Sequence, residues 1–178
     1  MKRLFLSVFM LLVAFATFAQ SRPKLIVGIA VDQMRWDYLH RYYNLYCEGG
    51  FKRLMNEGFD CENTMINYIP AITAVGHTSI YTGTVPSIHG IQANNFLLNG
   101  KMTYCTADST VSGVGTDSKA GQMSPRNMLT TTIGDELKVA TSFKSRVFGV
   151  SIKDRAAILP AGHAADAAYW IDSKQSKF

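Results

Sequence analysis

Apolar and polar residues alternate along the chain in blocks that predict strands and helices in turn. Residues 24–31 form a continuous apolar run, which is typical of a strand buried on both faces of a parallel sheet. Asp32 ends this run and is therefore predicted at the carboxyl edge of the sheet, where open α/β sheets bind ligands. Further strands are predicted at 59–67, 146–153 and 168–171, and helices at 36–47, 51–56 and 73–81. The alternation predicts an α/β fold, a doubly wound and mostly parallel sheet with helices on both faces.

Turn and cap residues divide the second half of the chain. Asn99 and Gly100 separate two short apolar runs, 96–98 and 102–104, which predicts a β-hairpin. Residues 106–122 are rich in Thr, Ser, Gly and Asp and are predicted to form a surface loop. Ser124 and Pro125 then predict the N-cap and first turn of a helix. Its apolar stripe is expected to face the core and consists of Leu129, Ile133 and Leu137.

The N-terminus has the pattern of a secretory signal peptide. Lys2 and Arg3 precede an apolar run from Leu4 to Ala19 that ends in small residues. The run is shorter than the roughly 20 residues that span a bilayer, so a stable membrane anchor is not expected. We expect cleavage near Ala19, which gives a signal peptide at 1–19, a mature domain at 20–178, and a periplasmic or secreted protein.

The net charge limits the classes of binding partner, and the cysteine content limits the disulfide bonds. The formal charge of +5 falls to +3 when Lys2 and Arg3 are removed with the signal peptide, and no polybasic run remains. Nucleic acid and membrane surfaces are therefore not expected as partners, whereas a small anionic substrate is compatible with this charge. Cys47, Cys61 and Cys105 allow one disulfide and one free thiol after export, and their spacing leaves the pairing open.

Three places in the sequence carry groups that could act on a phosphate: Asp32, Thr73, and Lys153 with Arg155. A helix N-terminus, where Thr73 is predicted, attracts anions through its free N–H groups. A threonine hydroxyl needs a base or a metal to become a nucleophile, and Asp32 is a suitable hard ligand for such a metal. The period of the predicted strand directs Lys153 and Arg155 to the same side. Each group also has a structural alternative, as a turn residue, an N-cap or a solvated strand end.

The sequence from 70 to 83, PAITAVGHTSIYTG, resembles a conserved segment of the alkaline phosphatase superfamily. The resemblance is to its type I phosphodiesterase and nucleotide pyrophosphatase relatives, and it extends to Pro86, to the His-Gly-Ile at 89–91 and to Asn94 and Asn95. VDQMRWD at 31–37 fits the first metal-ligand segment of that family. SIKDR at 151–155 and GHAADAAYW at 162–170 resemble the phosphate-irrepressible alkaline phosphatase branch of Bacteroidetes-type bacteria.

The resemblance implies a zinc-dependent phosphate monoesterase with a threonine nucleophile and two zinc ions. Asp32 would ligate zinc, Thr73 would attack phosphorus and contact the same zinc, and Asn94 would donate a hydrogen bond to a phosphate oxygen. Lys153 and Arg155 would bind the phosphoryl oxygens. A monoester carries nearly two negative charges and a diester one, so this cation pair favours monoesters. A phosphodiesterase or nucleotide pyrophosphatase of the same superfamily is the alternative.

Other titratable residues are expected to be structural. His77 and His89 fit structural positions near the nucleophile helix, His163 is expected to pack or hydrogen-bond, and Asp37 and Asp154 are expected to be surface or capping groups.

The remaining zinc ligands of the family come from the second half of a chain of several hundred residues. We therefore expect this sequence to be the N-terminal part of such an enzyme, inactive and poorly soluble by itself. A non-catalytic remnant is the competing hypothesis, and the oligomeric state stays open.

Overall fold

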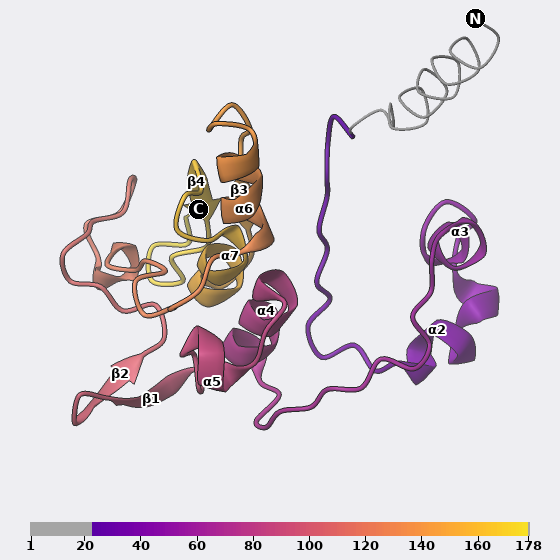
Figure 1. Ribbon diagram of the computed structural model, residues 1–178, viewed down its shortest axis with the longest axis horizontal. Coiled ribbons are helices and arrows are strands. Elements are labelled where there is room, and N and C mark those ends of the chain that lie inside the picture. Colours follow the sequence, from indigo (N-terminus) through magenta and orange to yellow (C-terminus); the bar gives the residue numbers. More distant parts are fainter. Residues whose placement is uncertain (1–22, 178) are drawn as a thin grey trace, which may run out of the picture. The chain divides into compact units, whose positions relative to one another are not determined.

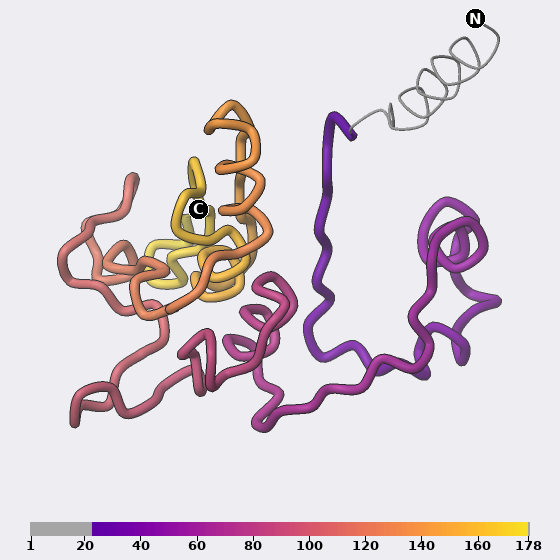
Figure 2. The backbone as a smooth tube through the Cα atoms, in the orientation of Figure 1, coloured from indigo at the N-terminus to yellow at the C-terminus, as the bar shows by residue number. Residues whose placement is uncertain are grey.

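The computed structural model describes residues 23–177, which divide at Val31 into two units. The predicted signal peptide at 1–19 lies outside the described residues. In the first unit, residues 24–31 run extended and exposed (Figure 2). Contrary to the sequence-based prediction, no strand within 23–177 pairs with them, so they form no buried strand. The predicted strand at 59–67 is likewise an exposed irregular segment. A buried strand requires neighbours that satisfy its N–H and C=O groups, and those neighbours are missing from the described residues.

The predicted N-terminal helices form, although the first is interrupted. The prediction for 36–47 resolves into α2 (Asp37–Arg41) and the 3₁₀ helix η1 (Tyr43–Leu45). The prediction for 51–56 is confirmed by α3 (Phe51–Glu57), which ends at Gly58.

Helix α4 (Thr73–Thr82) confirms the predicted helix at 73–81 and begins at Thr73. Ile72 is its N-cap residue and provides no side-chain cap, and Gly83 ends the helix in the left-handed conformation. The short helix α5 (Pro86–His89) follows, with its proline in the first turn.

The predicted hairpin is confirmed. Strands β1 (Asn95–Leu98) and β2 (Lys101–Tyr104) pair antiparallel, and both turn residues have positive φ, 50° at Asn99 and 78° at Gly100. This turn chemistry matches the twist of the two strands. The predicted surface loop at 106–122 is partly wrong, since Thr106 and Asp108 are buried, and it contains η2 (Lys119–Gly121).

Helix α6 (Ile133–Ala140) begins later than predicted and faces the other way. Thr132, not Ser124, is its N-cap and forms a capping box with Asp135. The predicted core stripe is wrong, because Leu129 is 76% exposed and Ile133 is 64% exposed. The buried face instead carries Thr132, Asp135 and Lys138, whose polar groups have partners inside the protein.

A parallel β–α–β unit forms the last part of the described chain: β3 (Phe148–Val150), α7 (Asp154–Ala161) and β4 (Ala167–Tyr169) (Figure 1). Strand β3 is shorter than the predicted 146–153 because Lys153 is already the N-cap of α7. The prediction for 168–171 is confirmed by β4, shifted by one or two residues. A Cβ at Gly149 would overlap the Ala157 carbonyl, so this glycine permits the close contact of β3 with α7.

The core joins α4, the hairpin and α7. Its buried members are Ala74, Ile91, Phe96, Cys105, Met128 and Leu159. Helix α7 packs on α4 and on both strands of the parallel pair. Parallel strands joined by a covering helix make this an α/β fold, incomplete within the described residues because its sheets have two strands each.

Two further features concern export. Cys47 and Cys61 are exposed, Cys105 is buried, and all three are free thiols in the structure. None of the helices in the described part of the chain is both long and apolar enough to cross a bilayer.

Candidate active site

Thr73 and Asp32 meet at the start of α4. Thr73 Oγ1 donates a hydrogen bond to Asp32 Oδ2 at 3.0 Å, although 41 positions separate the two residues in the sequence. Thr73 is half-buried and Asp32 is exposed. The contact places a hydroxyl and a carboxylate oxygen side by side at a helix N-terminus without a side-chain cap. Such an end, with free N–H groups and a positive dipole, favours an anion.

Asn94 lies beside the same helix end. Its Oδ1 accepts a hydrogen bond from the Ala74 N–H at 3.1 Å, and its side chain is half-buried. Because Oδ1 accepts, the amide Nδ2 group remains the donor side of the carboxamide. Asn95 is exposed and is the first residue of β1. Of the two neighbouring asparagines, Asn94 is therefore the one held next to Thr73.

Arg155 belongs to a hydrogen-bond network that the sequence did not indicate. Its Nη1 donates to the Tyr104 hydroxyl at 2.8 Å, and that hydroxyl donates to Asp154 Oδ1 at 2.9 Å. Asp154 Oδ2 accepts from Thr106 Oγ1 at 2.5 Å. The prediction that Asp154 is a surface or capping group is wrong, since its carboxylate is half-buried and joins α7 to the end of β2. The hydrophobic pattern does not indicate a role for Tyr104. Its position at the end of a predicted hairpin strand was the one feature that could have drawn attention to it.

Lys153 and Arg155 line one hollow of about 290 Å³, together with residues of the 171–173 segment. The strand geometry from which the two cations were predicted to face the same side is wrong. They lie at the N-cap and the second residue of a helix, not two positions apart on a strand.

The lining of this hollow does not include Thr73 or Asp32. A chain of contacts nevertheless connects the two groups. The Cys105 N–H donates to the Asn94 carbonyl at 2.9 Å, next to the Tyr104 that holds Arg155, and α4 packs against α7.

The histidines near Thr73 make structural contacts, as expected. His77 Nδ1 donates to the Thr73 carbonyl at 2.9 Å. His89 is fully buried, with Nδ1 accepting from the Ile91 N–H and Nε2 lying 3.0 Å from Ser79 Oγ. Burial lowers the pKa of His89, which favours the neutral imidazole. The expectation for His163 is wrong, because its side chain is exposed.

The oxygens of Asp32 and Thr73 fit part of a metal site. Both are hard donors, and 3.0 Å separates them, so they could contact one cation. Among residues 23–177, no group of three or more His, Cys, Asp or Glu side chains is arranged to hold a metal. Metal sites in proteins generally take three or four protein ligands. Within residues 23–177, these two oxygens therefore do not make a complete metal site.

A second hollow lies elsewhere. It measures about 730 Å³ and is lined mainly by residues of the 111–125 loop and of the 158–172 segment. It contains none of the predicted site residues. His163, Asp172 and Lys177 are among its lining residues, and none of them is proposed here for catalysis.

A threonine at a helix start, hydrogen-bonded to an aspartate on an incomplete α/β scaffold, defines the candidate site. The chain belongs to the type I phosphodiesterase / nucleotide pyrophosphatase family, whose model matches residues 26–177.

Its relatives include named alkaline phosphatases. Alkaline phosphatase PafA of Elizabethkingia meningoseptica is 58% identical over 165 residues, which cover 91% of this chain and 30% of that protein. A protein of Myroides odoratus named calcium-transporting ATPase is 57% identical over 166 residues, covering 90% of this chain and 30% of the relative. This chain thus spans about 30% of the length of the curated relatives that it matches.

Solved structures give the same relationship. The crystal structure of wild-type PafA matches with a TM-score of 0.87 at 58% identity, covering 90% of this chain and 31% of that chain. A PafA mutant, in which one threonine, one asparagine, one lysine and one arginine are replaced, matches with a TM-score of 0.86 at 55% identity and covers 90% and 32%. The fold is therefore that of an alkaline phosphatase, present in part.

Proposed function

We propose that the polypeptide containing these residues is a zinc-dependent phosphate monoester hydrolase, an alkaline phosphatase that uses Thr73 as its nucleophile. The observation that carries this proposal is the 3.0 Å contact between Thr73 Oγ1 and Asp32 Oδ2 at the start of α4, whose N-cap residue Ile72 provides no side-chain cap. Residues 20–178 would form the nucleophile-bearing N-terminal part of the catalytic domain. The other metal ligands would come from outside this segment.

The mutated positions of PafA support the choice of site residues. In that protein the replaced threonine and asparagine are 21 positions apart, and the replaced lysine and arginine are 2 positions apart. Thr73 and Asn94, and Lys153 and Arg155, have the same residue types in the same order and with the same two spacings. We assign Thr73 as the nucleophile, Asn94, Lys153 and Arg155 as substrate-binding residues, and Asp32 and Thr73 as metal ligands.

Each residue has a defined task in the proposed reaction. Thr73 Oγ1 forms a bond to phosphorus as the bond from phosphorus to the ester oxygen breaks, which gives phosphothreonine and an alcohol or phenol that takes up a proton. Water then cleaves phosphothreonine and regenerates the hydroxyl. Asn94 Nδ2 would donate to a phosphoryl oxygen. Asp32 and Thr73 would hold one zinc ion, which supplies charge neutralisation and lowers the pKa of an oxygen ligand.

Lys153 and Arg155 would determine the substrate class. Two cations at one hollow offset the second negative charge that a monoester carries and a diester lacks. The substrate is then a small phosphate ester. The N-terminal signal pattern supports a periplasmic or secreted location after cleavage near Ala19.

A phosphodiesterase or nucleotide pyrophosphatase is the second candidate, and the name of the matching family model favours it. The two candidates differ in what the cation pair does. In a diesterase, Lys153 and Arg155 would contribute no more to monoester turnover than to diester turnover.

The test is to replace Lys153 and Arg155 by Ala, singly and together, in the full-length polypeptide. We expect kcat/KM for an aryl phosphate monoester to fall roughly 100-fold or more, and kcat/KM for the matching diester to fall less than about 10-fold. Lys144→Ala, at an exposed lysine outside the hollow, is the matched control and should leave both unchanged. Equal losses for monoester and diester would refute the monoesterase assignment.

A further inference from the structure

The guanidinium group of Arg155 has one nitrogen, Nη1, in a hydrogen bond and another, Nε, without a partner among the described residues. Nη1 donates to the Tyr104 hydroxyl at 2.8 Å. Nε is buried and has no hydrogen-bond partner within residues 23–177. A buried N–H without a partner costs free energy, and each such group requires an explanation. A ligand that accepts from Nε would provide one.

The geometry of a guanidinium defines what that ligand would be. Nε–H and one N–H of Nη2 point along the same edge, whereas Nη1 lies at the far end of the planar group. This edge is a fork that matches two oxygens of one phosphoryl group. Because Tyr104 binds Nη1, the Nε/Nη2 fork is the edge that remains for an anion.

The Tyr104 hydroxyl has a fixed donor and acceptor role in this network. Its hydroxyl donates its only proton to Asp154 Oδ1 at 2.9 Å, so the bond with Arg155 must use a lone pair of the hydroxyl. The Arg155 guanidinium also lies 5.9 Å from the centroid of the Tyr104 ring. Two contacts, one to the hydroxyl and one to the ring, therefore restrict Arg155.

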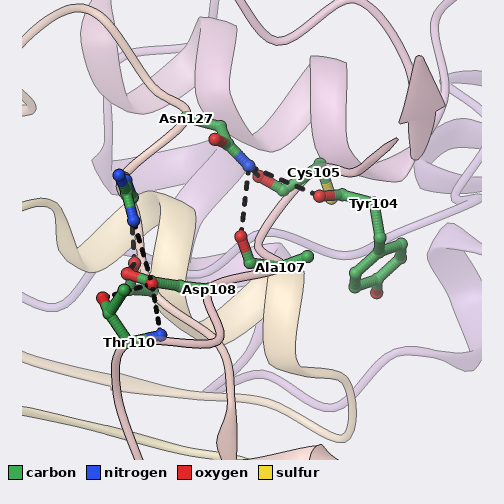
Figure 3. Close-up of polar contacts among 8 residues, drawn as sticks. Tyr104, Cys105, Ala107, Asp108, Thr110 and Asn127 are labelled. Carbon is green, nitrogen blue, oxygen red and sulfur yellow. Dashed lines mark hydrogen bonds and ion pairs between the residues drawn. The ribbon is translucent and has the colours of Figure 1, made fainter. Parts of the chain in front are cut away.

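The backbone around Tyr104 is braced as well. Asn127 Nδ2 lies 3.1 Å from the Cys105 carbonyl oxygen and within 3.5 Å of the carbonyl oxygens of Tyr104 and Ala107, to which it donates (Figure 3). The Cys105 N–H bonds the Asn94 carbonyl, so the same segment contacts the residue beside Thr73. Burial raises the pKa of Tyr104 to about 12, so its hydroxyl keeps its proton at neutral and moderately alkaline pH.

We propose that Tyr104 is a positioning residue that turns the Nε/Nη2 edge of Arg155 toward the phosphoryl group and thereby sets the preference for monoesters. This inference rests on the proposed function. Tyr104 touches neither the reacting atoms nor the substrate; its hydroxyl determines which edge of Arg155 is presented. A merely structural Tyr104 would affect folding and all substrates alike.

The test is Tyr104→Phe in the full-length polypeptide, which removes the hydroxyl and keeps the ring. We expect kcat/KM for an aryl phosphate monoester to fall about 10-fold, the inhibition constant of inorganic phosphate to rise by a similar factor, and kcat/KM for the matching diester to change less than about 2-fold. In an Arg155→Ala background, Tyr104→Phe should have no further effect, because the group that it positions is gone. Tyr43→Phe is the matched control, since the Tyr43 hydroxyl also has a side-chain partner, Asn56.

A second variant tests the same role of Tyr104 if Tyr104→Phe folds poorly. Asp154→Asn weakens the acceptor that orients the Tyr104 hydroxyl, and we expect a smaller loss, about 3-fold, that is again selective for the monoester. Equal losses on both esters, no loss, or a full loss in the Arg155→Ala background would overturn the role of Tyr104. If Arg155→Ala itself spares monoester turnover, the proposed function fails first, which separates the two outcomes.

Discussion

The Thr73 hydroxyl donates its proton to Asp32 in this structure, at 3.0 Å between the two oxygens. A neutral hydroxyl is a weak nucleophile and needs a base or a metal to lose its proton. A cation shared by the same two oxygens changes this, because it stabilises the alkoxide over the alcohol. Under the proposed function, this contact is the arrangement of the two oxygens before a metal binds.

Asn94 provides a test at the scale of single residues. Asn94→Ala in the full-length polypeptide removes a carboxamide that lies against the Ala74 N–H, beside Thr73. We expect kcat/KM for a phosphate monoester to fall roughly 10- to 100-fold, as when a polar group that stabilises the transition state is lost. Steady-state kinetics on Asn94→Ala and on the exposed neighbour Asn95→Ala will measure it. A loss in Asn95→Ala that equals the loss in Asn94→Ala would contradict the choice between them.

Sequence motifs predicted the nucleophile side of the site better than the cation side. Recognisable sequence motifs surround Asp32, Thr73 and Asn94. The structure brings the side chains of these three residues to one helix end. Tyr104 and Asp154 could not be predicted, because their interaction joins positions 50 residues apart and depends on how α7 meets the hairpin. A residue pattern carries no information about such a contact.

At the scale of elements, α6 depends on its capping box. Thr132 Oγ1 accepts from the Asp135 N–H at 3.2 Å, and the Thr132 N–H donates to Asp135 Oδ2 at 2.8 Å. We expect Thr132→Ala to lower the free energy of unfolding of the full-length polypeptide by about 1 kcal/mol, within a range of about 0.5–2. Denaturant unfolding monitored by circular dichroism measures this loss. Thr131→Ala, which removes an exposed hydroxyl next to the cap, should cost less, and a larger loss in Thr131→Ala would contradict the account.

The inner face of α6 explains why its orientation could not be predicted from the sequence. Hydrophobicity assigns the core to Leu129, Ile133 and Leu137, yet the buried side carries Lys138, whose Nζ lies 2.6 Å from Asp166 Oδ2. Hydrogen bonds from Lys138, from the Val147 N–H and from Arg146 hold the pKa of Asp166 well below its usual range. A paired buried charge of this kind satisfies its own polar groups and can replace apolar packing. Elements whose turns carry specific residues, such as the Asn99–Gly100 hairpin, were predicted correctly because the signal is local.

At the scale of the whole molecule, this chain spans about 30% of the length of its curated relatives. The apolar run at 24–31 and the outer side of α6 are exposed, with Leu25 at 78% and Ile133 at 64%. Surfaces of this kind in a soluble protein are normally covered. No strand among residues 23–177 pairs with 24–31 or 59–67. An apolar run does not specify its partner strands, so the sequence could assign the fold class and yet misassign these two elements.

The central claim is that Thr73 receives the phosphoryl group and that ligands outside this segment activate it. The most direct measurement is to mix the full-length polypeptide with zinc and a phosphate monoester, quench with acid, and locate the added phosphoryl group by mass spectrometry. We expect phosphate on the peptide containing Thr73, dependent on zinc, absent from Thr73→Ala, and absent when the 178-residue chain is treated in the same way. Phosphate on another residue, or undiminished monoester turnover by Thr73→Ala, would contradict it.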